Sequence, residues 1–223
     1  MTTREMIQKL CELYHMEHTW AVLNNSLAPF LSDPASCQYH HAYPGGLADH
    51  SIGVFFRLVR TASDGIQDNP SLFKIAIVHD FCKIGTYTQT MKSQKVKGKD
   101  GKFLLNSYGK PVWEDVEGYE KAPFPSPVMG HGDSSVLIAL RHGIELTDSE
   151  IMCVRWHMGA YDTHEGEDSY RMSQAIEMVP LIGLVQAADL MDAKCPQSEI
   201  DRDNSFITLM READSSVQCP FSN

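Results

Sequence analysis

Hydrophobic side chains recur at helical spacing along most of the chain, and this pattern predicts a body built from α-helices. Leu72, Ile75 and His79, for example, fall at positions i, i+3 and i+7, which lie on one face of a helix. Thr147 and Glu150 form a capping box, so a helix is expected to begin directly after Thr147. Helices are expected over residues 4–24, 47–62, 71–82, 131–142, 148–158, 173–193 and 204–213.

Residues 86–128 break the helical pattern. Segments 86–98 and 102–110 alternate in polarity and are rich in β-branched and aromatic residues, which is typical of strands. The turn signal Lys99-Asp100-Gly101-Lys102 lies between them and predicts a hairpin. We therefore expect an all-α fold with a small β-hairpin inserted at 86–124, in one domain that covers residues 1–223.

The apolar runs and the cysteine spacing argue against a membrane-spanning or exported protein. No apolar run approaches the ~18–20 residues of a membrane helix, and the N-terminus has no apolar signal-peptide core. The six cysteines form no CxxC pair, so reduced thiols and a cytoplasmic location are expected, with no membrane partner.

Charge is unevenly distributed along the chain. The net charge of −10 is unfavourable for wrapping duplex DNA, but it does not exclude a small phosphorylated substrate. Residues 86–110 contain six lysines against one aspartate, whereas the remaining residues carry 13 basic against 28 acidic side chains. These lysines are either a solvated face of the ribbon or an electrostatic lip for an anionic substrate or partner.

The pair His79-Asp80 is the strongest local sign of chemistry. At a helix end, the imidazole nitrogen and the carboxylate can reach one metal ion, and the carboxylate can bridge two ions. Asp189 lies in a helix too apolar to accept an unpaired carboxylate, so it needs a compensating cation. His131 begins one expected helix and His157 ends another.

The order His50, His79-Asp80, His131, His157, Asp189 resembles the H…HD…H…H…D pattern of the HD-domain metal-dependent phosphohydrolase superfamily. The segment 40–50, HHAYPGGLADH, is similar to the opening of HD domains related to bacterial 3′–5′ exoribonucleases and to relaxase-associated proteins. The resemblance covers roughly residues 38–192. The hairpin after HDxxK and the pair Phe81-Cys82 depart from the usual family pattern.

The resemblance implies an HD-type helical bundle with two metal ions and a role for each residue of the pattern. His50, His79, Asp80 and Asp189 would hold the first ion, and Asp80 would bridge to a second ion held by His131 and His157. These nitrogen and oxygen ligands suit Mn²⁺, Fe²⁺, Co²⁺, Ni²⁺ or Zn²⁺, and they suit Mg²⁺ poorly.

Two further residues are candidates for contact with substrate. Lys83 could bind a phosphate oxygen or stabilise developing charge during catalysis, and His41 would line the substrate pocket by resemblance.

Plainer interpretations of these residues stay open. His79 and Asp80 could form a buried hydrogen bond, and His131 and His157 could cap helix ends. Lys83 could be a solvated helix end, and His41 could belong to a loop held by backbone hydrogen bonds.

The sequence therefore favours a hydrolase that cleaves a phosphomonoester or phosphodiester of a nucleotide or a short single-stranded nucleic acid. The nucleophile would be a metal-bridged hydroxide, and Asp80 and Lys83 would be its catalytic residues. A di-iron oxygenase with nearly the same ligands, and a nucleotide-binding or partner-binding module, remain the alternatives.

Overall fold

The computed structural model describes residues 1–62, 68–122, 129–162 and 167–217. Its elements are helices with one two-stranded ribbon, which confirms the mostly helical fold with an inserted hairpin. The α-helices are α1 (Thr3–Leu13), α2 (Glu17–Asn24), α3 (Gly46–Thr61), α4 (Asn69–Val78), α5 (His131–Arg141), α6 (Asp148–Trp156), α7 (Glu167–Met178), α8 (Leu181–Lys194) and α9 (Glu199–Val217).

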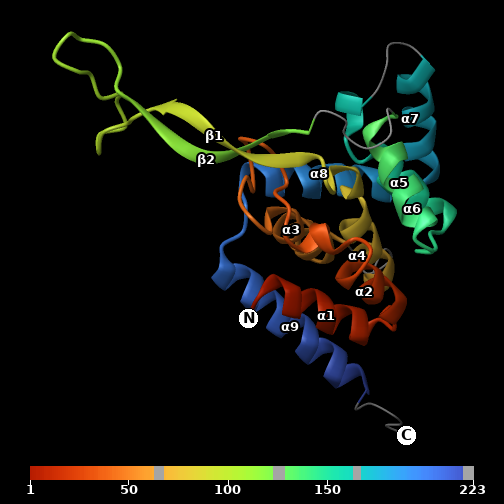
Figure 1. The fold of residues 1–223 in the computed structure, drawn as a ribbon. Helices are drawn as coiled ribbons and strands as arrows, with labels where there is room; N and C mark the ends of the chain where they lie inside the picture. The colour runs from red at the N-terminus through yellow and green to blue at the C-terminus, as the bar shows by residue number, and fades with distance from the viewer. Residues whose placement is uncertain (63–67, 123–128, 163–166, 218–223) are drawn as a thin grey trace, which may run out of the picture.

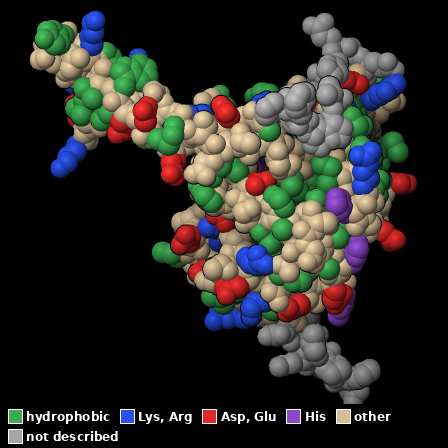
Figure 2. Space-filling model, viewed as in Figure 1, with side chains coloured by type: hydrophobic (Ala, Val, Ile, Leu, Met, Phe, Trp, Pro, Cys, Tyr) green, Lys and Arg blue, Asp and Glu red, His purple; other side chains and the backbone are tan. Residues whose placement is uncertain are grey.

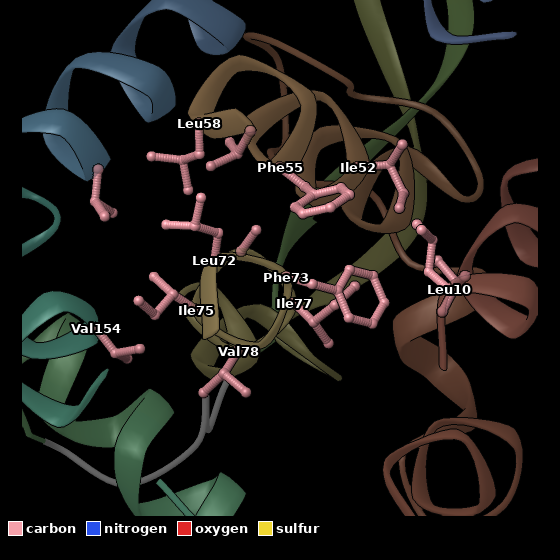
Figure 3. Close-up of a cluster of buried hydrophobic side chains, with 14 of the residues drawn as sticks. Leu10, Ile52, Phe55, Leu58, Leu72, Phe73, Ile75, Ile77, Val78 and Val154 are labelled. Atoms are coloured by element: carbon pink, nitrogen blue, oxygen red, sulfur yellow. The ribbon is translucent and has the colours of Figure 1, made fainter. Parts of the chain in front are cut away.

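Helix α3 lies at the centre of the helical body. It packs against α4 and α8, and also against α1 and α9. The Phe55 ring of α3 and the Phe73 ring of α4 meet edge to face with centroids 5.3 Å apart. Figure 3 shows the surrounding apolar cluster, to which α1 contributes Leu10 and α6 contributes Val154. Helices α3 and α4 are therefore buried along most of their length. Side chains near the start of α3 and at the end of α4 lie in the interior of the protein.

Two expected helices are each broken into two. The segment 4–24 divides into α1 and α2, because His15 adopts a left-handed conformation with a φ of 56°, which a helix cannot continue. The segment 173–193 divides into α7 and α8 at Pro180, which has no N–H to donate to the preceding turn. The helix expected at 204–213 is longer than predicted, since α9 begins at Glu199.

The two helices that meet at Pro180 are bent by 109°. Within the described ranges no single helix is long and apolar enough to cross a membrane, and α7 and α8 reach that length and composition only when taken together.

The hairpin pairs differently from the prediction. Strand β1 (Tyr87–Lys95) pairs antiparallel with β2 (Trp113–Lys121), not with the segment 102–110. The residues between the strands form two tight turns, closed by the bridges Lys97–Phe103 and Leu105–Pro111. The turn at Lys99–Lys102 therefore exists, but it lies at the outer end of a longer ribbon that projects from the helical body (Figure 1).

The capping box at the start of α6 is confirmed, and it does more than cap the helix. Glu150 is buried and accepts from the Thr147 backbone N–H at 2.8 Å. Its carboxylate also accepts from the Ser71 hydroxyl at 2.8 Å and from the Lys74 ammonium group at 3.1 Å, both on α4. Glu150 thereby joins two helices that each end at the candidate site.

We expect Glu150→Ala to lower the free energy of unfolding by about 3 kcal/mol, because it leaves partners on two helices unpaired. Thr147→Ala removes one cap and should cost about 1 kcal/mol. Urea denaturation of both variants compares the two values. Equal losses would mean that the contacts to α4 contribute nothing.

Candidate metal centre

The end of α4 carries His79 and Asp80 into the interior of the protein. His79 follows the last residue of α4, and Asp80 precedes the short 3₁₀ helix η2 (Phe81–Lys83). Both side chains are almost completely buried. A carboxylate in such a place needs compensating positive charge.

Four histidines surround the Asp80 carboxylate in two pairs. Its Oδ2 lies 3.4 Å from Nε2 of His79 and 3.5 Å from Nε2 of His50. Its Oδ1 lies 2.7 Å from Nε2 of His131 and 3.7 Å from Nε2 of His157. The histidines come from α3, the end of α4, the start of α5 and the end of α6. The two carboxylate oxygens thus face separate histidine pairs, and each set of three side chains can hold a metal ion.

Backbone hydrogen bonds fix the tautomers of two of these histidines. Nδ1 of His79 lies 2.7 Å from the Ala76 carbonyl, and Nδ1 of His157 lies 2.7 Å from the Val154 carbonyl. A carbonyl only accepts, so each Nδ1 carries a proton, and Nε2 is the atom of each ring that faces Asp80 and would carry the lone pair in a neutral ring. Nε2 of His157 is buried without a hydrogen-bond partner among the described residues. Lone pairs and a carboxylate that converge in this way fit a cation.

His50 joins two further carboxylates to this arrangement. Its Nε2 lies 3.0 Å from Asp189 Oδ1, and its Nδ1 lies 2.9 Å from Asp192 Oδ2. Burial acts to lower the pKa of His50, but the hydrogen bonds with Asp189 and Asp192 raise it to about 9. The surroundings of His50 therefore favour a positive charge at this ring, which either a proton or a metal ion on Nε2 would supply. Asp189, which was predicted to need a cation, indeed lies beside one of the histidine pairs.

Burial and neighbouring groups determine the charges of the side chains around Asp80. Burial alone would raise the pKa of the Asp80 carboxyl, but the Lys83 ammonium group and the neighbouring histidines hold it well below its usual range. Nζ of Lys83 lies 2.6 Å from Asp80 Oδ2. Burial lowers the pKa of His79, so its imidazole is neutral, as a metal ligand must be.

The donor set bears on which metal ions could bind. Imidazole nitrogens and carboxylate oxygens suit Mn²⁺, Fe²⁺, Co²⁺, Ni²⁺ and Zn²⁺ better than Mg²⁺. The nearby Cys82 is not expected to be a ligand, because burial raises the pKa of its thiol to about 12.

A cavity of about 570 Å³ opens onto this centre. Lys83, His157 and Asp189 line it, so two of the candidate ligands and the predicted substrate-binding lysine share one space. Its volume lies within the range of about 300–1,000 Å³ that is usual for small-molecule sites.

His41 does not line this cavity, although it was predicted to bind substrate. It is buried, with Nε2 2.9 Å from Asp192 Oδ2 and Nδ1 2.9 Å from the Tyr43 hydroxyl. Both ring nitrogens are therefore engaged within the protein, which favours a positioning role. Its neighbour His40 lines the cavity instead, and its buried Nε2 has no partner among the described residues. His41 has a left-handed backbone, with a φ of 49°.

Asp192 was missed in the sequence, and it supports the candidate ligand His50. Its carboxylate accepts from Nδ1 of His50 and from Nε2 of His41, both at 2.9 Å, and Arg57 Nε lies 3.4 Å away. A carboxylate that holds the far nitrogen of a ligand histidine orients the ring and raises its basicity. Asp192 follows Asp189 by three residues in an apolar helix, and that spacing was the available signal.

Polar contacts continue from His41 and Tyr43 to the helices at both ends of the chain. The Tyr43 hydroxyl donates to Asp49 Oδ2 at 2.9 Å. Asp49 Oδ1 pairs with Arg202 of α9 at 2.7 Å and accepts from the hydroxyl of Thr3, on α1. A contiguous series of polar contacts therefore connects the candidate centre to the N-terminal and C-terminal helices.

Comparisons of the chain with models of known families, with curated proteins and with solved structures found no match. The resemblance to the HD-domain superfamily therefore depends on the order of ligand-type residues, and it stays a prediction. The structure itself shows a mostly helical protein with buried clusters of histidine and aspartate that can hold metal ions.

We expect Asp192→Asn to raise the dissociation constant for Mn²⁺ or Zn²⁺ about 10–100-fold, because His50 loses the carboxylate that orients it. Chelator competition measures the constant, and the visible spectrum of the Co²⁺-loaded protein reports the geometry. Asp201→Asn, at an exposed position on α9, is the control. Wild-type affinity in Asp192→Asn would show that His50 needs no such support.

Gly53 gives a second test, because a Cβ at this position of α3 would collide with the Asp192 carboxylate. We expect Gly53→Ala to displace Asp192 and weaken metal binding about tenfold or more. The matched control is Gly183→Ala in α8, where a Cβ meets open space. This control should raise the unfolding free energy by about 0.5–1 kcal/mol without changing metal affinity. Unaltered affinity and stability in Gly53→Ala would contradict the close approach.

Proposed function

We propose that the protein is a metal-dependent phosphohydrolase that acts on a phosphomonoester or phosphodiester of a nucleotide or a short single-stranded nucleic acid. The observation that carries this proposal is the orientation of Asp80, whose two oxygens face separate histidine pairs. One carboxylate placed in this way can hold two metal ions side by side. Two divalent ions ~3.5–4 Å apart activate a water molecule and neutralise charge on the phosphoryl oxygens.

The histidines and carboxylates divide between the two sides of Asp80. His50, His79 and Asp189 would hold an ion beside Oδ2. His131 and His157 would hold an ion beside Oδ1. The unpartnered Nε2 of His157 supports the second position, since a buried lone pair without a partner is costly.

Two cavity residues would bind the substrate. The Lys83 ammonium group lies at the boundary between Asp80 and the cavity, where it would bind a phosphate oxygen and stabilise charge that develops on it. Burial, together with the nearby charges of His50 and Lys83, lowers the pKa of His40 to about 4. His40 is therefore neutral near pH 7, and its free Nε2 would hydrogen-bond a polar group of the substrate.

We expect Asp80→Asn and Lys83→Gln to lose different properties of the protein. Asp80→Asn should lose both metal binding and hydrolysis, because an amide does not supply the bridging charge. Lys83→Gln should keep its metal and lose about 10²–10³-fold in kcat, as expected when one charge-stabilising donor is removed. Elemental analysis and hydrolysis of bis(p-nitrophenyl) phosphate by the Mn²⁺-loaded full chain measure the two effects.

Lys9→Gln, at an exposed position on α1, controls for the loss of a lysine. Full hydrolysis by folded Asp80→Asn would contradict the proposal. Two irons per chain with oxygen-dependent turnover would assign the same ligands to an oxygenase instead, since both enzymes would use this donor set.

A further inference from the structure

The inserted ribbon is the feature that the candidate metal centre does not explain. It leaves the helical body after η2 and returns at α5, and its outer part stands away from the helices (Figure 1). Each strand has nine residues, which span about 30 Å. We define the ribbon tip as residues 95–113, which include the two tight turns between the strands.

Charge changes sign along the ribbon. The tip contains five lysines and one aspartate, and all five lysines are exposed. The segment of β2 nearer the helical body, residues 114–121, contains four acidic residues and one lysine. The positive charge is therefore concentrated at the part of the ribbon farthest from the acidic helices.

Large aromatic rings are exposed among these lysines. The exposed fractions are 50% for Phe103, 86% for Tyr108 and 57% for Trp113. Nζ of Lys95 lies 5.4 Å from the centroid of the Phe103 ring and 5.5 Å from that of Trp113. In Figure 2, hydrophobic side chains gather on the projecting ribbon, and basic side chains extend from its outer end.

This combination matches one class of ligand better than others. Lysines that neutralise phosphates, interleaved with aromatic rings on which bases stack, characterise surfaces that bind single-stranded nucleic acid. Duplex DNA offers no free base faces for stacking, and the acidic body disfavours wrapping it. An acidic protein surface would pair with the lysines, but it would not account for the exposure of three aromatic rings.

We propose that the ribbon tip binds single-stranded nucleic acid. This inference deepens the proposed function and rests on it, because it selects a single strand over a free nucleotide as the substrate. The acidic residues of β2 separate the tip from the cavity, so the tip serves as a tether that raises the local concentration of the strand. It does not form a continuous track to the metal centre.

Fluorescence anisotropy of a labelled oligothymidylate of about 20 nucleotides tests the binding. The full chain is used in EDTA, so that hydrolysis does not contribute. We expect Lys95→Gln/Lys97→Gln/Lys102→Gln to weaken binding about tenfold or more, and to reduce the slope of log K against log salt by about 2. Phe103→Ala/Trp113→Ala should weaken binding about tenfold or more and leave that slope nearly unchanged.

The matched control is Lys9→Gln/Lys121→Gln/Arg141→Gln, which removes the same charge at exposed positions outside the tip. Equal losses in the control and the tip variant, or equal binding of a duplex, would overturn the proposal. The proposal would also be overturned if sedimentation showed self-association through the tip and the protein did not bind the oligonucleotide.

Hydrolysis of bis(p-nitrophenyl) phosphate by the tip variants separates this proposal from the proposed function. It should stay at the wild-type rate, because that small substrate does not reach the tip. Normal hydrolysis without oligonucleotide binding would overturn the tether alone. Binding of the oligonucleotide without hydrolysis of bis(p-nitrophenyl) phosphate, whichever metal ion is added, would overturn the proposal that the protein is a phosphohydrolase.

Discussion

The buried carboxylate of Asp80 is the constraint on which the rest of the centre depends. Its oxygens face imidazole nitrogens, and at His79 and His157 backbone carbonyls hold the Nδ1 protons, so that Nε2 would carry the lone pair of each neutral ring. Lone pairs and a negative charge repel one another in a low-dielectric interior, unless a cation lies between them. Lys83 supplies part of this positive charge at Oδ2, but Nε2 of His157 keeps no hydrogen-bond partner in the described part of the chain. Metal ions would satisfy both sides of the carboxylate, so the cluster is a candidate metal centre.

The helical body meets this constraint by bringing helix ends together and by allowing close approach. His79, His131 and His157 stand at the ends of helices, where a side chain can face inward without interrupting the packing. Two glycines then remove the atoms that would hold the elements apart. A Cβ at Gly53 would collide with the Asp192 carboxylate, and a Cβ at Gly132 would collide with the Arg155 carbonyl. The first contact supports His50, and the second brings the start of α5 against α6, so that His131 and His157 share Asp80. Packing and the geometry of the ligands are therefore determined by the same positions.

Local patterns allowed the helices and most candidate ligands to be predicted, whereas long-range pairing could not be. His79 and Asp80 are adjacent in sequence, and Asp189 stands out in an apolar helix, so single segments revealed them. Asp192 acts through His41 and His50, which are more than 140 residues away, and no local pattern reports such a contact. His40 lines the cavity and His41 binds Asp192 instead, and the left-handed backbone at His41 is a conformation that the sequence does not announce. The alternation of β1 was recognised, but alternation does not identify the partner strand, and 113–121 replaced 102–110.

The distribution of charge explains why a phosphoester substrate would need several separate cationic groups. A chain with a net charge of −10 attracts divalent cations and repels free phosphates over the distance of a Debye length, ~8–10 Å. Recognition of phosphate must then come from groups close enough to outweigh this repulsion. Within the cavity these groups would be bound metal ions and the ammonium groups of Lys83 and Lys194. A longer polyanion would experience repulsion from the whole acidic surface, and cations inside a cavity cannot offset it at a distance. A basic surface carried about 30 Å outward on a ribbon would solve this problem, since it would meet the strand beyond the range of the acidic helical body.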